Sequence, residues 1–346
     1  MSVTIKDVAR LAGVSPSTVS RVLANHPKIS QETARRVREA MERLGYVPNA
    51  AAKSLVSQTT QTLGIILPRA AEELFVNPFF PEVLRGISVQ AQQAGYDLLL
   101  ASGSTDREER EAVARLVLGR RVDGVLLLCS RSGDPVIRFL REQRFPFVLI
   151  GRAEDDEGSG EIVSVDTDNV RAAYDATRHL LEKGHRCIAF ISGPQTFVVR
   201  QDRLAGYRAA LAEADIPVRP EWVIEAPFLQ EGGYLALDRL LHMPERPTAL
   251  VVTDDIIAIG ILRRLYQYGW RVPDDLALVS FNNVALAELT TPPLTTVDID
   301  IYRLGTTAIS LLLRRITGEV LPSPRVIVPH RLIVRESCKS TTLRRH

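Results

Sequence analysis

The sequence predicts an α/β protein in which a small all-helical N-terminal domain precedes a core of two doubly wound lobes. A length of 346 residues is more than one compact core holds, and it suits a small domain followed by a large, divided one. Residues 1–60 place their apolar side chains at helical spacing, whereas after residue 61 short apolar runs alternate with longer amphipathic segments. Near-continuous apolar strands between helices are typical of parallel sheets covered on both faces.

The bulk composition is that of an ordinary folded protein, with 45% hydrophobic and 24% charged residues. No apolar run approaches the ~20 residues that span a bilayer, and the first residues lack the apolar stretch of a signal peptide. We therefore expect a cytoplasmic protein without a membrane segment. Cys129, Cys187 and Cys338 are spaced for neither a zinc site nor a disulfide framework, so we expect no metal, no cofactor and a reducing compartment.

The first predicted helix covers Ile5–Leu11. Thr4 suits its N-cap position, and its apolar face carries Ile5, Val8 and Leu11. Gly13 ends the helix with the backbone freedom that a tight turn between helices requires. Ser15 then caps a second helix, and Pro16 fits the first helical position.

The second helix is short and presents a polar face to solvent. It buries Val19, Val22 and Leu23 and turns outward Ser17, Thr18, Ser20 and Arg21. A third helix runs from Ser30 to about Leu44, where Gly45 ends it, and its Val37, Met41 and Leu44 complete the small core. This order of elements is the helix-turn-helix pattern, whose second helix enters the major groove of DNA. Residues 1–60 hold nine Lys and Arg against four acidic residues, as expected of a domain that meets a polyanion.

The string from Thr4 to Leu23 closely resembles the headpiece of the LacI/GalR family of transcription regulators, and residues 45–49 match that family's exit to its hinge. The resemblance extends over nearly the whole chain. It implies a lambda-repressor-like helix-turn-helix headpiece and a periplasmic-binding-protein-like core of two Rossmann-like lobes. The implied boundaries are 1–48 for the headpiece, 49–61 for the hinge helix and linker, 62–338 for the core with its two discontinuous lobes, and 339–346 for a C-terminal tail.

The same resemblance implies which residues contact double-stranded operator DNA. Pro16, Ser17 and Arg21 match the positions that read bases, and an arginine that forks onto guanine is the chemically obvious contact. The phosphate backbone would be held by Thr4, Ser15, Ser20, Asn25 and His26. Further DNA contacts are implied for Tyr46, Asn49, Ala52 and Leu55.

The hinge admits two interpretations. A helix as short as residues 49–55 is unstable alone in water, so a plain linker is one of them. The resemblance favours the other, in which the segment folds on the operator beside its dimer mate. Leu55 then wedges into the minor groove at the central base step.

The core shows nine short apolar runs, from Leu63–Leu67 to Ala277–Phe281, with helices between them. Ligands bind at the carboxyl ends of such strands, and two facing lobes bring those ends to one cleft. The residues that follow the strands predict an effector site of Asn77, Phe79, Phe80, Arg152, Phe197, Arg203, Phe228, Thr253, Asp254 and Asn282. Amides, charged groups and aromatic rings together suit a neutral polyhydroxylated ligand such as a sugar.

Several of these positions match effector contacts of the family. Arg203 matches its ligand-clamping arginine, although an interlobe salt bridge is the alternative. Phe228 matches an aromatic ring that stacks on the ligand, or it is a plain core residue. Asn282 falls where sugar-responsive members often carry aspartate, and Asp254 either contacts ligand or only caps the following helix. Residues 76–80 and 280–284 most resemble the maltose-operon regulators, which suggests maltose or a related glucoside.

The sequence favours a regulator over other classes of protein. It contains no phosphate loop, nucleophile elbow, dinucleotide fingerprint or zinc pattern, so we expect no enzyme. An exported sugar-binding protein would lack residues 1–60. A harder alternative is a catabolite-control-type regulator governed by a phosphocarrier protein, which would bind near Phe79–Ala94. The C-terminus has no leucine heptads, so we predict a homodimer, and whether the effector induces or corepresses stays open.

Overall fold

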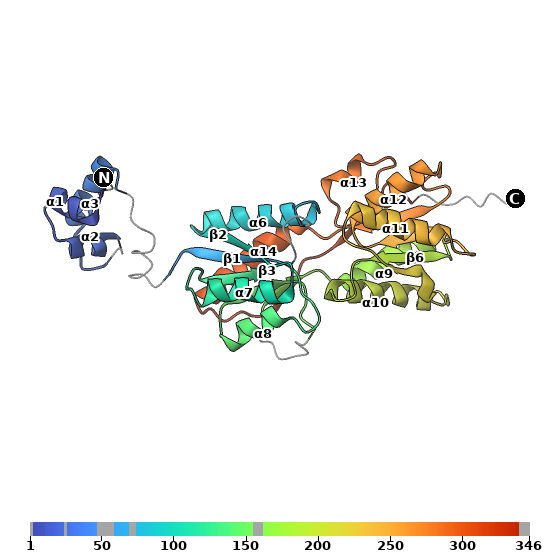
Figure 1. Cartoon of the computed structure of the whole chain (residues 1–346), viewed down its shortest axis with the longest axis horizontal. Helices are drawn as coiled ribbons and strands as arrows, with labels where there is room; N and C mark the ends of the chain where they lie inside the picture. Colours follow the sequence, from blue (N-terminus) through green and yellow to red (C-terminus); the bar gives the residue numbers. More distant parts are fainter. Residues whose placement is uncertain (1–2, 24–25, 47–58, 69–73, 155–161, 339–346) are drawn as a thin grey trace.

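The computed structural model describes residues 3–23, 26–46, 59–68, 74–154 and 162–338. Figure 1 shows a small helical domain and two α/β lobes along the long axis of the molecule. The predicted fold class, a helix-turn-helix headpiece followed by a periplasmic-binding-protein-like core, is confirmed.

The headpiece consists of α1 (Ile5–Ala12), α2 (Pro16–Leu23) and α3 (Gln31–Leu44). Local side chains close the helix ends as predicted. The Asp7 carboxylate accepts hydrogen bonds from the backbone N–H and hydroxyl of Thr4, and the Ser15 hydroxyl accepts one from the Thr18 N–H at 3.1 Å. Gly13 and Gly45 end α1 and α3 at φ values of 64° and 61°, a left-handed conformation that favours glycine.

The predicted apolar face of α1 is wrong at one position. Val8 is fully buried, but Leu11 is 42% exposed, and Ala9 and Ala12 are buried in its place. The α3 helix comes close to the end of α1, where Arg36 donates to the Ala12 carbonyl, and the small side chains of Ala9 and Ala12 fill that contact. A periodic pattern alone does not reveal how near the neighbouring helix approaches.

The first lobe is built on a six-stranded sheet with the order β11-β5-β4-β3-β1-β2, in which all neighbours are parallel. Its strands are β1 (Thr62–Leu67), β2 (Asp97–Ser102), β3 (Gly124–Leu127), β4 (Phe147–Ile150), β5 (Ser164–Asp166) and β11 (Arg325–Ile327). The helices that cover it are α6 (Phe79–Gln93), α7 (Asp106–Val117), α8 (Pro135–Glu142) and α14 (Ile301–Ile316).

The second lobe has a six-stranded sheet with the order β12-β10-β9-β8-β6-β7, in which only β12 runs antiparallel, beside β10. Its strands are β6 (Ile188–Ser192), β7 (Val223–Glu225), β8 (Ala249–Val252), β9 (Ala277–Phe281), β10 (Thr295–Asp298) and β12 (Arg331–Ile333). Its helices are α9 (Asn169–Glu182), α10 (Val198–Glu213), α11 (Gln230–Leu241), α12 (Asp255–Gln267) and α13 (Ala285–Leu289), and a 3-10 turn, η1 (Pro220–Trp222), precedes β7.

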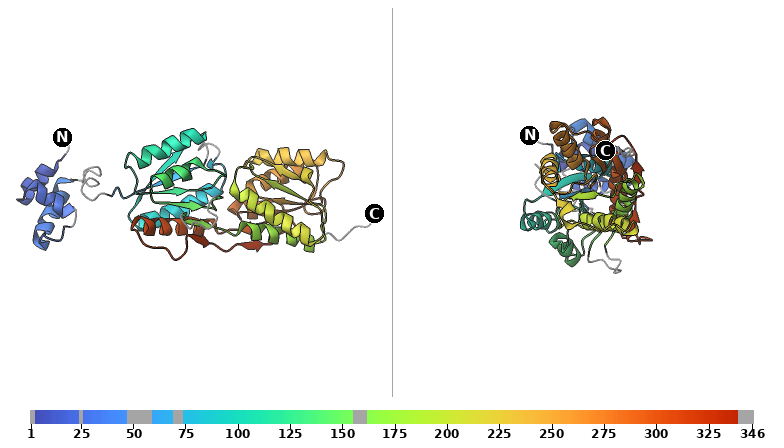
Figure 2. Two further views of the ribbon diagram at one scale, coloured as in Figure 1. Left: turned by 90° about the horizontal axis from the view of Figure 1, so that it is seen from below. Right: turned by 90° about the vertical axis from the view of Figure 1, so that its right-hand side faces the viewer.

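The chain passes between the lobes three times, after β5, after β10 and after β11. Consequently α14, which follows β10 of the second lobe, packs against β3, β4 and α6 of the first. Figure 2 shows each sheet with helices on both faces and the connecting segments running beneath both lobes.

Most element bounds agree with the predicted ones. β4, β8 and β9 begin and end where the apolar runs do, because these central strands are buried on both faces. The amphipathic segment that predicts α10 begins at Asp202, whereas the helix itself begins four residues earlier, at Val198. The apolar runs do not indicate the strands β10, β11 and β12 or the helices α8 and α13. In the described part of the chain, no helix is long and apolar enough to cross a membrane.

Candidate functional site

One cavity lies between the lobes at the carboxyl ends of the strands. It encloses about 1080 Å³, including the open space at its mouth. All ten predicted effector residues line it: Asn77, Phe79, Phe80, Arg152, Phe197, Arg203, Phe228, Thr253, Asp254 and Asn282. The expectation that ligands bind at the carboxyl ends of the strands, which we call the strand-end rule, therefore selected side chains that share one cavity. They lie as much as 205 positions apart in the sequence, from Asn77 to Asn282.

Arg203 is a buried cation in the wall of this cavity. Its Nε donates to the Asn169 Oδ1 at 2.9 Å, and its Nη1 donates to the Thr253 carbonyl at 2.6 Å. Its guanidinium carbon lies 4.3 Å from the centre of the Phe281 ring. All three partners belong to the second lobe, and among the described residues Arg203 forms no salt bridge between the lobes. Burial lowers the pKa of Arg203 to about 10, and the nearby carboxylates of Asp254 and Asp166 oppose that shift.

Some polar atoms in the cavity wall have no hydrogen-bond partner among the described residues. The Nη2 of Arg203 donates to none of the described residues, although the side chain is buried and charged. Two hydroxyls of the same wall, the Oγ1 atoms of Thr167 and Thr253, are buried and likewise have no partner among the described residues. Unsatisfied polar groups are costly to bury, and two such hydroxyls in one cavity wall indicate a ligand that supplies the missing partners.

Asp254 joins the two lobes. Its Oδ2 accepts from the Asn77 Nδ2 of the first lobe at 3.0 Å and from the Asn282 Nδ2 of the second at 3.1 Å. Its Oδ1 accepts from the Ile256 N–H at 2.9 Å and so caps α12. Burial raises the pKa of Asp254, against these stabilising hydrogen bonds. The helix-capping role is thus present, and the same carboxylate also lines the cavity.

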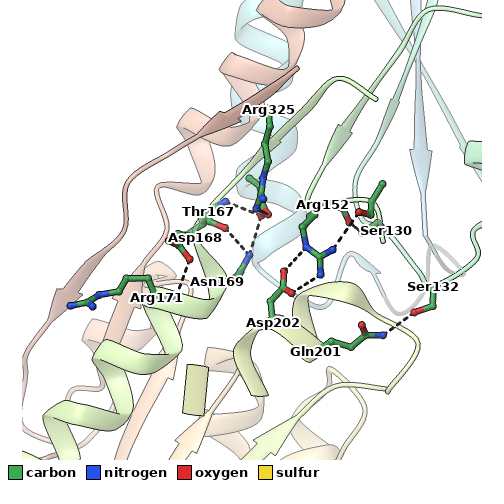
Figure 3. Close-up of polar contacts among 12 residues, drawn as sticks. Ser130, Ser132, Arg152, Thr167, Asp168, Asn169, Arg171, Gln201, Asp202 and Arg325 are labelled. Atoms are coloured by element: carbon green, nitrogen blue, oxygen red, sulfur yellow. Dashed lines mark hydrogen bonds and ion pairs between the residues drawn. The ribbon is translucent and has the colours of Figure 1, made fainter. Parts of the chain in front are cut away.

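Arg152 pairs across the cleft instead of standing free. Its Nε and Nη2 donate to the two carboxylate oxygens of Asp202 at 3.2 and 2.7 Å, as Figure 3 shows. Further contacts tie the same edge: the Gln201 Nε2 donates to the Ser132 Oγ at 2.8 Å, and the Ser132 N–H donates to the Thr196 carbonyl at 3.0 Å. Arg152 and Asp202 therefore both line the cavity and join the two lobes.

Aromatic rings form two clusters in the cavity wall. Phe79 and Phe80 meet edge to face at 5.2 Å, and Phe197 and Phe228 do so at 5.8 Å. Phe228 is half-buried, and its ring lies over the backbone of Gly193, where an added Cβ would come within 2.0 Å of the Phe228 Cζ. Gly193 is therefore required for the position of this ring.

The cavity is also lined by residues absent from the predicted effector site, among them the polar side chains of Asp166, Thr167, Asn169 and Asp202. Asp166 is the last residue of β5, and Thr167 and Asn169 come directly after it, so a search at the carboxyl ends of the strands would have found all three. Asp166 accepts from the Asn169 Nδ2 at 3.0 Å and from the Arg325 Nη2 at 2.9 Å. Burial raises the pKa of Asp166 to about 6, although Arg325 opposes the shift. Asp202 carries no such signal, because it lies inside α10.

The headpiece displays the predicted recognition residues on one exposed surface. Ser15, Pro16, Ser17 and Arg21 are exposed at the start and along the outer face of α2, and Ser20 is half-buried. The Ser15 Oγ lies 2.8 Å from the Ser17 Oγ, so these hydroxyls share a hydrogen bond. Thr4 caps α1, His26 is exposed, and Tyr46 packs against the headpiece core. Asn25, Asn49, Ala52 and Leu55 lie outside the described residues.

These two sites define the class of protein: a helix-turn-helix DNA-binding domain joined to a two-lobed ligand-binding core. A model of the lacI family of bacterial regulatory proteins matches residues 4–49, and a model of a periplasmic binding protein-like domain matches residues 177–338. The HTH-type transcriptional regulator MalR of Streptococcus pneumoniae serotype 4 is 41% identical over 82% of this chain and 84% of its own length. Catabolite control protein A of Priestia megaterium is 35% identical over 98% of this chain and 100% of its own length.

The chain belongs to the lacI family of bacterial regulatory proteins. It is a DNA-binding transcription regulator and not an enzyme. Solved structures agree: the lac repressor dimer bound to operator and the anti-inducer ONPF superimposes with a TM-score of 0.85 at 26% identity, covering 98% of this chain and 100% of that one. The complex of the transcriptional regulator CelR with cellobiose gives a TM-score of 0.76 at 35% identity, covering 97% and 99%.

Proposed function

We propose that this regulator represses a carbohydrate-utilisation operon and that a neutral sugar, maltose or a related glucoside, changes its operator affinity from the interlobe cavity. The observation that carries the proposal is the pair of buried hydroxyls without a partner among the described residues, those of Thr167 and Thr253. They share the cavity wall with the Arg203 guanidinium and two pairs of aromatic rings. Sugar hydroxyls satisfy such groups, and aromatic rings cover the C–H faces of a pyranose. The cellobiose complex of the related CelR supports a glucoside as the ligand.

The charges around the cavity favour a neutral ligand over a phosphorylated one. Three carboxylates, those of Asp166, Asp202 and Asp254, face the two cations Arg152 and Arg203, and Arg152 is already paired. A phosphate group would meet this acidic surplus, whereas a neutral polyol meets donors and acceptors of both kinds.

The contacts across the cleft suggest how the ligand acts on DNA binding. Asn77 to Asp254 and Arg152 to Asp202 join the lobes through side chains that a bound sugar also reaches. A ligand that exchanges these hydrogen bonds binds the closed and open arrangements with different affinity, which is what coupling requires. A tenfold change in operator affinity needs a coupling of only ~1.4 kcal/mol.

On the operator we propose a homodimer that works in the cytoplasm, with two α2 helices in major grooves of half-sites about one helical turn, ~10 bp, apart. In this proposal Pro16, Ser17 and Arg21 read bases, and Thr4, Ser15, Ser20 and His26 hold phosphates. Exposed apolar side chains on the packed helices α11, α12 and α13 offer a surface for the second subunit: Leu235, Tyr266 and Leu289 are 65%, 84% and 76% exposed.

The experiment is fluorescence anisotropy of the full-length protein on a palindromic duplex with a central CG step, at fixed salt, with and without maltose. We expect tight binding that maltose weakens, while a scrambled duplex binds weakly under both conditions. Tight binding that ignores maltose, cellobiose and other neutral glucosides contradicts the sugar effector and favours control by a phosphocarrier protein, the alternative raised by the similarity to catabolite control protein A. Equal affinity for palindrome and scrambled duplex contradicts sequence-specific repression.

A further inference from the structure

The end of the first lobe opposite the cavity carries a group of exposed arginines, which we call the basic edge. Its members are Arg115, Arg120, Arg121, Arg144 and Arg315. None of the five pairs with a carboxylate in the part of the chain that the structure describes. The exposed acids of the same turns are Asp97, Glu142 and Glu319, and Glu319 is neutralised by Arg314 at 2.6 Å. Residues 61–346 as a whole hold more acidic than basic residues, so this edge is unlike the rest of the core.

The sheet topology places these arginines side by side. Arg120 and Arg121 precede β3, and Arg144 precedes β4, which is the parallel neighbour of β3. Arg315 lies in the last turn of α14, whose next residue, Ile316, reaches within 2.9 Å of the position of a Cβ on Gly124, the first residue of β3. All of these turns therefore meet at the amino ends of the strands.

Backbone conformation gives an independent indication that these arginines have a role. Arg120 and Arg144 follow α7 and α8 with φ values of 49°, in the left-handed region where a side chain is strained. After α6, α9, α12 and α14 the corresponding left-handed residues are glycines: Gly95, Gly184, Gly269 and Gly318. After α10 the residue is Asp215, at a φ of 55°, and aspartate tolerates this conformation better than arginine does. Glycine would relieve the strain at residues 120 and 144 too, so the retained arginines point to a use for their charge.

The basic edge also lies where the chain leaves for the headpiece. Asp123, in the same turn as Arg120 and Arg121, accepts from the N–H of Thr60 at 2.7 Å and from that of Gln61 at 2.8 Å. These bonds fix the end of the linker at this edge, and Figure 1 shows β1 entering the lobe from the side of the headpiece. Tyr46 and Thr59 are 13 positions apart in the chain, so a headpiece on DNA stays within about 45 Å of the edge whatever path the linker takes.

We propose that the basic edge binds the phosphate backbone of the same DNA duplex, beyond the bases that the headpieces read. The core then contributes a sequence-independent part of operator affinity, which adds to the salt dependence without changing base preference. This inference rests on the DNA-binding function of the protein. It goes beyond the headpiece and hinge, to which the proposed operator contacts are confined.

The test compares two full-length triple variants that remove the same charge. One changes the basic edge, Arg120→Gly, Arg121→Gln and Arg144→Gly, and the glycines suit the left-handed turns, so the lobe should fold at least as stably as the unaltered one. The control, Arg186→Gln, Arg208→Gln and Arg239→Gln, alters three exposed arginines of the second lobe. Anisotropy titrations over a range of salt use a duplex of operator length and one extended by about two helical turns, ~20 bp, on each side.

We expect the basic-edge variant to bind the long duplex about tenfold more weakly at low salt. Its dependence of log K on log salt should be flatter by about 0.9 for each phosphate that the core no longer neutralises. The short duplex should show a smaller change in affinity, and the control variant none. Equal salt slopes for the two variants on both duplexes overturn the inference and leave the edge to an acidic protein partner. Discrimination between operator and scrambled duplex by the unaltered protein tests the DNA-binding function separately, so the two failures are distinguishable.

Discussion

The recognition helix α2 and the interlobe cavity present their polar side chains in opposite ways. Ser17 and Arg21 of α2 are exposed to water, and the Arg21 guanidinium makes no hydrogen bond or ion pair within the described residues. Arg203 of the cavity is 5% exposed and already donates to Asn169 and Thr253. An exposed arginine gives up only hydration when it meets DNA, whereas a buried one must be stabilised by the protein before any ligand arrives.

Because of this difference, binding at the two sites is expected to affect the rest of the molecule to different degrees. α2 can bind bases without any rearrangement of the core, because the Arg21 side chain faces water. The cavity residues are bonded to one another across the lobes, as Asn77 is to Asp254, so a ligand that binds them must alter the interlobe contacts. Allosteric sensitivity is thus expected of the buried site and simple additive affinity of the exposed one.

The largest expected effect is that of Arg203→Ala on the ligand response. Removal of this buried cation deletes the proposed donor to the ligand and takes a donor from the Asn169 Oδ1 and the Thr253 carbonyl, which should weaken sugar binding by ~2–5 kcal/mol. Operator affinity without sugar should stay within a few fold. Calorimetric titration with maltose and anisotropy on operator measure the two effects, and Arg171→Ala on the exposed face of α9 is the control. A retained maltose response removes Arg203 from the site.

The buried carboxyl of Asp166 should give the core a pH dependence that α2 lacks. Its pKa is raised to about 6 in the folded protein, so between pH ~4 and ~6 the folded state binds more protons than the unfolded state. The free energy of unfolding therefore falls as the pH rises through this window, by an amount on the order of 2–3 kcal/mol. Urea denaturation of the protein and of Asp166→Asn at several pH values measures the difference. A difference independent of pH contradicts the raised pKa.

Arg21→Ala should weaken operator binding by ~1–3 kcal/mol and relax the preference at one base pair. Binding to random DNA should change little, because a base contact carries no affinity there. Anisotropy on a set of single-base operator variants reveals the relaxed position, with Arg43→Ala on α3 as the exposed control. Equal weakening on operator and random DNA would show a phosphate contact only.

The smallest effect concerns the pair of Arg152 and Asp202. Their side chains are 32% and 13% exposed, so solvent screening limits the coupling energy to ~0.5–1 kcal/mol in a double-mutant cycle. Unfolding of Arg152→Ala, Asp202→Ala and the double variant measures that energy. Sugar affinity should fall equally in both single variants if the pair acts only by joining the lobes. A much larger fall for Arg152→Ala shows direct contact between Arg152 and the ligand.

Local sequence patterns determined many of the helix ends and strand bounds of this protein. The caps at Thr4, Ser15 and Ser30 and the glycines at 13 and 45 set the three headpiece helices, since each acts on backbone within a few residues. Apolar runs buried on both faces set β4, β8 and β9 to the residue. The strand-end rule collected the cavity residues, because parallel strands end at a common edge.

Only the tertiary structure decided which of these side chains meet. Asn77 and Asp254 are 177 positions apart, and Arg152 and Asp202 are 50 apart, so no local pattern relates them. The exposure of Leu11 and the short strands β10–β12 likewise depend on how closely neighbouring elements approach. Burial and pairing are properties of three-dimensional neighbours, whereas periodicity and capping act along the chain, and this is why the sequence located the sites and the fold connected their residues.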